Sequence, residues 1–136
     1  MICPSYPLKE QTVDYCTNAF DLKGSSTEYF GFTKLDDFPR YATTIYMADY
    51  EYIPDAGHIK IILKDEPPDT IKVKMQSLDV WNPNHLPSAP DSSRRVARER
   101  NNKRLNCLFI DGHSDDKNAL DITPYDFGLS VEHRFP

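Results

Sequence analysis

Residues 98–113 have the sequence Arg98-Glu99-Arg100-Asn101-Asn102-Lys103-Arg104-Leu105-Asn106-Cys107-Leu108-Phe109-Ile110-Asp111-Gly112-His113. A basic segment leads into a nearly continuous apolar run with the length of one strand, which predicts a strand buried on both faces. Asp111-Gly112 then predicts a tight hairpin turn, because glycine, and to a lesser degree aspartate, tolerates the positive φ of a primed turn. We therefore expect His113 just past the turn, at the rim of a sheet.

Other segments predict further strands. Residues 13–18 favour a strand, and so do residues 41–48, whose threonines, isoleucine and tyrosine suit a pleated surface. Residues 59–64 and 71–75 alternate lysine with apolar residues on either side of a turn, which predicts a second hairpin with one solvated face. Residues 129–135 predict a last strand.

Two segments between these strands also have a predicted form. A serine cap precedes residues 94–101, which we expect to form a short helix. Residues 82–92 contain three prolines, which predicts a rigid loop that displays Trp81 and His85.

Composition sets the fold class. The chain has 136 residues, 39% of them hydrophobic, which suits one domain with one core. Its eleven prolines, five glycines, seven phenylalanines and eight tyrosines favour short strands and ordered loops over long helices. We predict an α+β fold, a mostly antiparallel sheet with a C-terminal β-hairpin and one short helix. The net charge of −5 argues against general nucleic-acid affinity, and no run of about 18 apolar residues is present to span a membrane.

Four segments resemble, in the same order, a large bacterial family of prepilin-type proteins, the type II secretion and type IV pilin-like proteins named for a histidine, nine residues and Asp-Gly. Cys3-Pro4-Ser5 resembles the family's Cys-Pro-Ser/Asp segment, and Asp14-Tyr15-Cys16-Thr17-Asn18 its Ser-Tyr-x-x-Asn segment. Residues 34–49, ending in Thr44-Ile45-Tyr46-Met47-Ala48-Asp49, resemble its Pro-Ser-x-Thr-Ile-Leu-x-Ala-Asp segment. Residues 106–113 resemble its Asn-Val-Leu-Phe-x-Asp-Gly-His ending. Asn101 stands where the family has its histidine, which weakens any role for that residue here.

The resemblance implies a pilin-like globular domain over residues 1–136, with the lysine hairpin and the proline-rich loop as a variable insertion at about residues 50–93. The implied function is that of a minor pilin or a type II secretion pseudopilin, which assembles an envelope filament or contacts its cargo. Its partners would be other pilin-like subunits and secreted cargo, at the periplasmic side or the cell surface. Family members are anchored in the inner membrane by an N-terminal helix. The sequence begins at the segment that follows this helix, so we expect either a removed anchor or a naturally anchorless protein.

A cluster of Asp49, Asp111, His113, Asp115 and Asp116 is the best candidate for a metal site. Asp49 and Asp111 each end a predicted strand, so we expect both on one rim of the sheet. Several carboxylates on a short loop suit calcium, which accepts six to eight oxygen ligands in flexible geometry. Some pseudopilins of related systems hold calcium in a C-terminal loop. The alternative is a plain hairpin turn beside a solvated acidic loop.

The three cysteines have no zinc-binding spacing. We expect Cys107, in the apolar strand, to be a buried free thiol. Cys3 and Cys16 are candidates for a disulfide in an exported protein, although sequence alone cannot establish that bond.

Six of the eleven residues from Arg94 to Arg104 are basic, which suggests either a patch for phosphate or acidic polysaccharide, or a solvated face that pairs with carboxylates. We favour the second interpretation.

Asp111, His113 and Ser114 suggest a hydrolase only superficially. No oxyanion hole, Gly-x-Ser-x-Gly elbow, phosphate-binding glycine loop or His-Glu-x-x-His helix accompanies them, so we expect no enzyme. The alternative to a pilin-like protein is a free-standing binding module for carbohydrate or another exported ligand, with Trp81, Tyr50 and Tyr52 as aromatic platforms.

Overall fold

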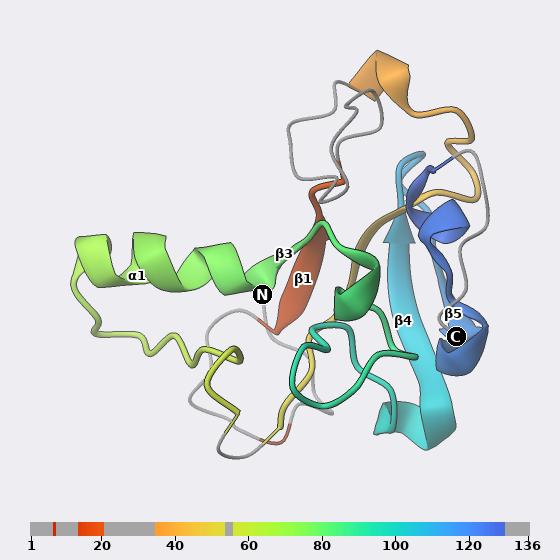
Figure 1. Ribbon diagram of the computed structural model, residues 1–136. Helices are drawn as coiled ribbons and strands as arrows, with labels where there is room; N and C mark the ends of the chain where they lie inside the picture. The colour runs from red at the N-terminus through yellow and green to blue at the C-terminus, as the bar shows by residue number, and fades with distance from the viewer. Residues whose placement is uncertain (1–6, 8–13, 21–34, 54–55, 130–136) are drawn as a thin grey trace.

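The computed structural model describes residues 7, 14–20, 35–53 and 56–129. Within them the fold is α+β, with a five-stranded mixed sheet and one short α-helix (Figure 1). The strands are β1 (Tyr15–Asn18), β2 (Ile45–Asp49), β3 (Asp79–Val80), β4 (Arg104–Phe109) and β5 (Ser114–Asn118), and the helix is α1 (Pro68–Met75). Short 3-10 turns lie at Leu35–Asp37, Gln76–Leu78, Pro83–His85, Arg100–Lys103, Ala119–Asp121 and Pro124–Phe127. None of the helices in these residues is long and apolar enough to cross a bilayer.

The sheet has the strand order β3-β1-β2-β4-β5. β2 lies in the centre and pairs antiparallel with both β1 and β4, and β5 pairs antiparallel with β4. β3 is a two-residue strand that pairs with β1 in parallel, Thr17 opposite Asp79. The sheet is therefore mostly antiparallel, as predicted, and this last pairing makes it mixed.

The predicted hairpin at Asp111-Gly112 is confirmed and joins β4 to β5. Gly112 has φ +92°, a conformation that glycine adopts without a steric penalty. The Gly112 amide donates to the Phe109 carbonyl, and the Phe109 amide donates to the His113 carbonyl, each at 2.9 Å. The turn thus closes through the backbone of its own five residues.

The prediction that this strand is buried on both faces is wrong. Along β4, the side chains of Leu105, Cys107 and Phe109 are buried, whereas Asn106 is exposed and Leu108 only half-buried. The strand therefore packs one face against the core, as antiparallel strands commonly do. The apolar run suggested two buried faces because Leu108 adds an apolar residue to the outer face.

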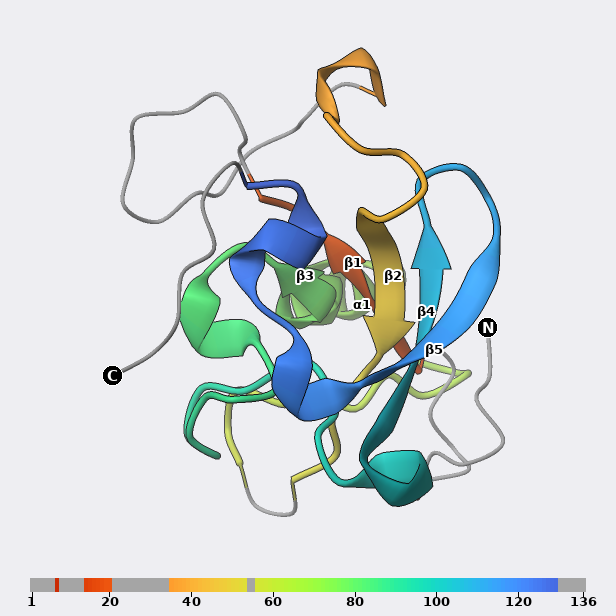
Figure 2. The same ribbon diagram turned by 90° about the vertical axis from the view of Figure 1, so that its right-hand side faces the viewer.

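One hydrophobic cluster fills the space on the inner face of the sheet. Buried side chains of β1, β2 and β4 meet residues from the connecting segments there, among them Ile62, Leu86 and Ile122. The Phe20 and Phe127 rings pack 5.5 Å apart within it. Figure 2 shows the chain leaving β5 and running back across the molecule through two 3-10 turns, drawn in blue.

The predicted hairpin of residues 59–64 and 71–75 is wrong. Residues 71–75 belong to α1, and residues 59–64 form no strand. Pro68 occupies the first turn of α1, where the fixed φ of proline favours a helix start, with Asp69 near the amino end and Lys72 and Lys74 near the carboxyl end. The alternation of lysine and apolar residues over residues 71–75 has the period of a strand. The proline at the start of α1 favours a helix, however, and a helix forms.

The predicted helix at residues 94–101 is also wrong. The Arg95 and Val96 amides donate to the His85 carbonyl, and the Ala97 amide donates to the Asp49 carbonyl. Val96 forms an isolated antiparallel bridge with Tyr50. These long-range bonds hold the segment extended until the 3-10 turn at Arg100–Lys103 begins.

The other predictions have mixed outcomes. The strands expected at residues 13–18 and 41–48 are confirmed in shorter form as β1 and β2. The strand expected at residues 129–135 lies almost entirely outside the described residues, and so does Cys3. The proline-rich loop does not display His85, whose side chain is buried.

Candidate functional site

The hairpin tip brings together two of the five residues expected to bind calcium. Oδ1 of Asp111 accepts hydrogen bonds from the His113 backbone amide, at 3.1 Å, and from His113 Nδ1. The imidazole stacks on the Phe109 ring, with centroids 4.5 Å apart and planes 4° from parallel. The hairpin tip is therefore one closed unit made of Phe109, Asp111, Gly112 and His113. The contacts within this unit account for the presence of these residue types at the turn.

Hydrogen bonding favours the charged form of the Asp111 carboxyl group. The side-chain bond from His113 and then its backbone amide lower the pKa of Asp111 below its ordinary value. Both side chains remain partly exposed at the molecular surface. With Nδ1 held by the carboxylate, only Nε2 of the imidazole faces other partners. Chemically, the pair can present one oriented imidazole nitrogen.

Asp49 lies away from this tip. Its carboxylate is buried, and its Oδ2 accepts from the Asn106 amide at 2.9 Å, near the beginning of β4. The expectation that Asp49 and Asp111 share a rim is wrong because β2 and β4 are antiparallel, which places their carboxyl ends at opposite edges. The Asp49 side chain, at the end of β2, instead binds the backbone near the start of β4.

Asp115 and Asp116 follow the turn on β5, where successive side chains point to opposite faces. Asp116 Oδ2 lies 2.7 Å from Arg104 Nε, and this hydrogen bond lowers the pKa of Asp116. Asp115 Oδ1 accepts from the Asp116 amide. Among the residues that the structure describes, no group of three or more His, Cys, Asp or Glu side chains is arranged to hold a metal ion. The five predicted ligands are not brought together.

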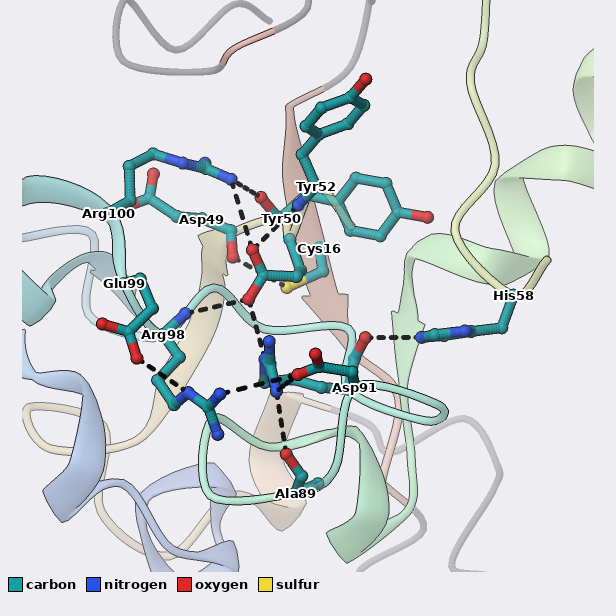
Figure 3. A network of polar contacts seen from close by, with 12 residues as sticks. Cys16, Asp49, Tyr50, Tyr52, His58, Ala89, Asp91, Arg98, Glu99 and Arg100 are labelled. Carbon is teal, nitrogen blue, oxygen red and sulfur yellow. Dashed lines mark hydrogen bonds and ion pairs between the residues drawn. The ribbon is translucent and has the colours of Figure 1, made fainter. Parts of the chain in front are cut away.

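The basic segment is organised by Glu51, which sequence analysis did not single out. Glu51 Oε2 accepts from Arg94 Nε at 2.8 Å and from the Arg98 amide at 3.2 Å (Figure 3). Its Oε1 accepts from the Tyr52 amide at 3.0 Å. Nothing in the local sequence marks this glutamate, because its arginine partners lie more than forty residues away. The Glu51 carboxylate therefore binds donors from three residues of the chain.

The arginines around Glu51 have further partners. Arg94, itself buried, donates to the Ala89 carbonyl at 3.0 Å and pairs with Asp91 at 2.7 Å. The hydrogen bond from Arg94 lowers the pKa of Asp91. Arg100 Nη2 donates to the Tyr50 carbonyl at 2.5 Å (Figure 3).

This network ties the segment after β2 to the segment before β4. The interpretation that the basic residues pair with carboxylates is confirmed for Arg94, Arg98 and Arg104. Arg94 is buried, however, rather than part of a solvated face. The network acts as a structural clamp, since its charges are directed at partners within the chain.

The aromatic residues proposed as carbohydrate platforms are poorly placed for that role. Tyr50 is fully buried, and its hydroxyl lies 3.0 Å from Ser77 Oγ. Tyr52 and Trp81 are half-buried. The Trp81 amide donates to His85 Nδ1 at 3.2 Å, and the two rings pack edge to face. Burial lowers the pKa of His85 to about 3, so the imidazole is neutral and serves as an internal acceptor for its loop.

Cys16 and Cys107 are buried free thiols, as expected for Cys107. Cys16 is a free thiol here, and Cys3 lies outside the described residues. The two thiols lie in one row across the inner face, with Ala48 of β2 between them. Two strand spacings separate them by about 10 Å, too far for a disulfide. Burial raises the pKa of Cys107 to about 12, which suppresses thiolate formation.

Three of the exposed apolar side chains in the described residues lie on α1 or shortly before it, while others, such as Leu35 and Leu120, lie elsewhere. Leu63, Val73 and Met75 are exposed, Val73 to 66%, and no residue of α1 is buried. Figure 1 shows α1 extending away from the sheet. Exposed apolar groups on a projecting element are typical of a contact surface.

Comparison of the chain with protein-family models, with curated proteins and with solved structures found no match. The functional interpretation therefore depends on the residues of this chain.

Proposed function

We propose that this chain is the globular domain of a prepilin-type protein, a minor pilin or type II secretion pseudopilin that acts by contact with other subunits or with cargo. One observation carries the proposal. Three of the four segments that resemble the family form the neighbouring strands β1, β2 and β4 of a single sheet. A shared scaffold requires this adjacency, and placement of β2 and β4 in separate sheets would have removed the basis of the resemblance.

The polar residues within those segments have structural roles. Asn18 Nδ2 donates to the Ile45 carbonyl at 2.7 Å and to the Phe127 carbonyl at 2.9 Å. Asp49 holds the start of β4, and Asp111 closes the hairpin turn. The residues that carry the resemblance therefore specify the sheet, which fits a family that shares a scaffold and varies its contacts.

The outer face of the sheet supports the same proposal. Thr17, Met47 and Leu108 form a row across β1, β2 and β4 on the face opposite the core, and all three are half-buried. Tyr46 beside them is exposed. Prepilin-type proteins pack an N-terminal helix against their sheet, and Met47 and Leu108 in this row offer apolar groups for such a contact.

The variable contacts would come from the segment that resembles nothing in the family. Residues 50–93 include α1 and the exposed Leu63, Val73 and Met75. Surface segments carried on a rigid scaffold are the usual places for recognition. On this proposal the protein works at the periplasmic side or the cell surface, where pilin-like subunits assemble.

Photo-crosslinking in cells tests the proposal. A photoreactive amino acid replaces Val73, or the exposed Lys103 as a control, in the natural gene of the producing organism. We expect position 73 to capture polypeptides that have a prepilin-type leader and apolar helix, identified by mass spectrometry, and position 103 to capture them less. Capture only of proteins without that leader, or none at either position, would contradict the pilin-like function.

A further inference from the structure

The two edges of the sheet are formed by β3 and β5. Figure 2 shows β5 on the outer side of β4, at the end of the strand order. An edge strand normally presents backbone amides and carbonyls that can pair with an extended segment of another chain. In both of these strands, outward backbone groups are instead bonded from within the chain.

The hydrogen-bond pattern of β4 determines which backbone groups of β5 point outward. The Phe109 amide donates toward β5, to the His113 carbonyl, whereas the Asn106 amide donates toward β2, to the Asp49 side chain. Successive residues of a strand direct their backbone groups to opposite sides, so residues 105, 107 and 109 face β5. Given the register of the two strands, the backbone groups of residues 114, 116 and 118 point to the open edge.

The middle one of these three positions is Asp116, and side chains bind both of its backbone groups. The Asp116 amide donates to Asp115 Oδ1 at 2.8 Å. The Asp116 carbonyl accepts from Arg104 Nη2 at 3.3 Å, and Arg104 Nε also donates to Asp116 Oδ2 at 2.7 Å. This second bond holds the guanidinium beside the strand. The centre of the β5 edge is therefore occupied.

The opposite edge is closed in a similar way. The Val80 carbonyl accepts from the Ala19 amide at 2.8 Å, so Val80 faces β1 and the backbone groups of Asp79 point away from β1. The Asp79 amide donates to the Gln76 carbonyl. The Asp79 carbonyl accepts from Arg95 Nη1 at 2.8 Å. At each edge of the sheet, an arginine thus occupies an outward carbonyl, and another group of the chain occupies the amide of the same residue.

We propose that Arg104 and Asp115 close β5 to strand addition and so keep copies of this chain from pairing edge to edge. An incoming strand has to displace both side chains before it can bond to Asp116. Partners of the chain therefore meet side chains at this edge, and the backbone is reserved for internal bonds. This role goes beyond the proposed assembly function and does not depend on which partner the chain contacts.

Sedimentation velocity tests the role by comparing the native chain with Arg104→Ala/Asp115→Ala from about 10 µM to about 1 mM. Both side chains are exposed, so their loss should cost little stability, and thermal unfolding checks that the variant folds. We expect the variant to associate at least about tenfold more tightly than the native chain, because two backbone groups become available for pairing. A variant that associates no more tightly overturns the proposal.

Matched variants separate hydrogen bonding from charge. Asp36→Ala/Lys64→Ala also removes one exposed charge of each sign, away from β5, and should change association less than about twofold. Arg104→Ala/Asp115→Asn has the same net charge as Arg104→Ala/Asp115→Ala but keeps an acceptor oxygen for the Asp116 amide. We expect it to associate at least about threefold more weakly than the alanine variant. Equal association of these two variants would mean that charge alone closes the edge, and would overturn the assigned hydrogen bond.

Two further measurements locate the contact. Adding Asp116→Pro to Arg104→Ala/Asp115→Ala removes the outward amide without breaking a bond to β4, and association should return to the native level. In Arg104→Ala/Asp115→Ala itself, the amides of residues 114, 116 and 118 should exchange with solvent more slowly as concentration rises, as NMR can measure. Association that persists with the proline, or that leaves these amides unprotected, would place the contact elsewhere and refute the role of this edge. The exchange result is decisive even if the proline variant does not fold.

Discussion

Glu51 shows how one residue can hold distant parts of this chain. Its carboxylate accepts from Arg94 Nε and from the Arg98 and Tyr52 amides while almost buried. Removing Glu51 would leave the buried Arg94 with only the exposed carboxylate of Asp91 as a counter-charge, and a buried charge that loses its partner is costly. Loss of the Glu51 side chain should therefore lower stability.

We expect Glu51→Ala to lower the free energy of unfolding by about 3 kcal/mol, since Arg94 stays buried beside the missing carboxylate. Glu99→Ala is the matched control, because Glu99 pairs with Arg98 at the surface and should contribute less than about 0.5 kcal/mol. Urea denaturation measures both. Equal losses in the two variants would show that Glu51 is no clamp.

Acid should weaken the hairpin through Asp111. Its pKa is lowered in the folded state, chiefly by His113, so the carboxylate contributes stability above its unfolded pKa of about 4 and loses it as pH falls through the folded pKa. We expect the melting temperature to fall as pH decreases below about 4, and Asp111→Asn to show a smaller fall. Asp36→Asn, an exposed change outside the hairpin, serves as control. A pH profile for Asp111→Asn that superimposes on that of the native chain would contradict the pairing.

At the scale of elements, the hairpin could be predicted from sequence because its determinants are local. The bonds that close the turn join Phe109, Asp111, Gly112 and His113 to one another, although the Asp111 amide also donates to the Tyr41 carbonyl. The strands β1 and β2 also appeared at the expected places, with shorter bounds. Local bonding of this kind is visible in a single stretch of sequence.

Elements that depend on distant partners could not be predicted in the same way. Residues 71–75 of α1 were expected to form a strand, because five residues are too few to separate a period of 2 from one of 3.6. The segment at residues 94–98 has helix-forming residues, yet bonds to His85 and Asp49 keep it extended. The sequence also did not reveal that β2 and β4 pair antiparallel. This pairing places Asp49 and Asp111 at opposite edges of the sheet, so the predicted calcium ligands do not lie together.

The hairpin offers a direct test at this scale. Gly112→Ala places a side chain at φ +92°, so we expect a loss of about 1 kcal/mol in the free energy of unfolding, although nothing crowds the new methyl group. Gly57→Ala has similar open space without a positive φ, and should be neutral or slightly stabilising. Chemical denaturation of both variants measures the difference. If both behave alike, backbone conformation does not limit the turn.

At the scale of the whole molecule, the sheet separates what holds the fold from what is available for contact. Its central strands carry the buried row of Cys16, Ala48 and Cys107. Its edges are formed by β3, which follows α1 in the chain, and by β5. Changes at the edges should therefore alter contacts with little effect on stability, whereas exposure of the central row requires the sheet to open.

The thiols of the central row report that opening. In a Cys3→Ser background, Cys16 and Cys107 are the remaining cysteines, both buried and both with raised thiol pKa. We expect each to react with a disulfide reagent about 1,000-fold or more slowly than an unfolded thiol, because reaction requires the rarely populated open state. The two rates should agree with each other and rise together in urea, since one cooperative sheet protects both. Ser92→Cys, at an exposed position, should react at nearly the unfolded rate. Mass spectrometry of peptides after timed labelling separates the sites, and rapid labelling of one central cysteine with protection of the other would mean that the sheet opens in parts.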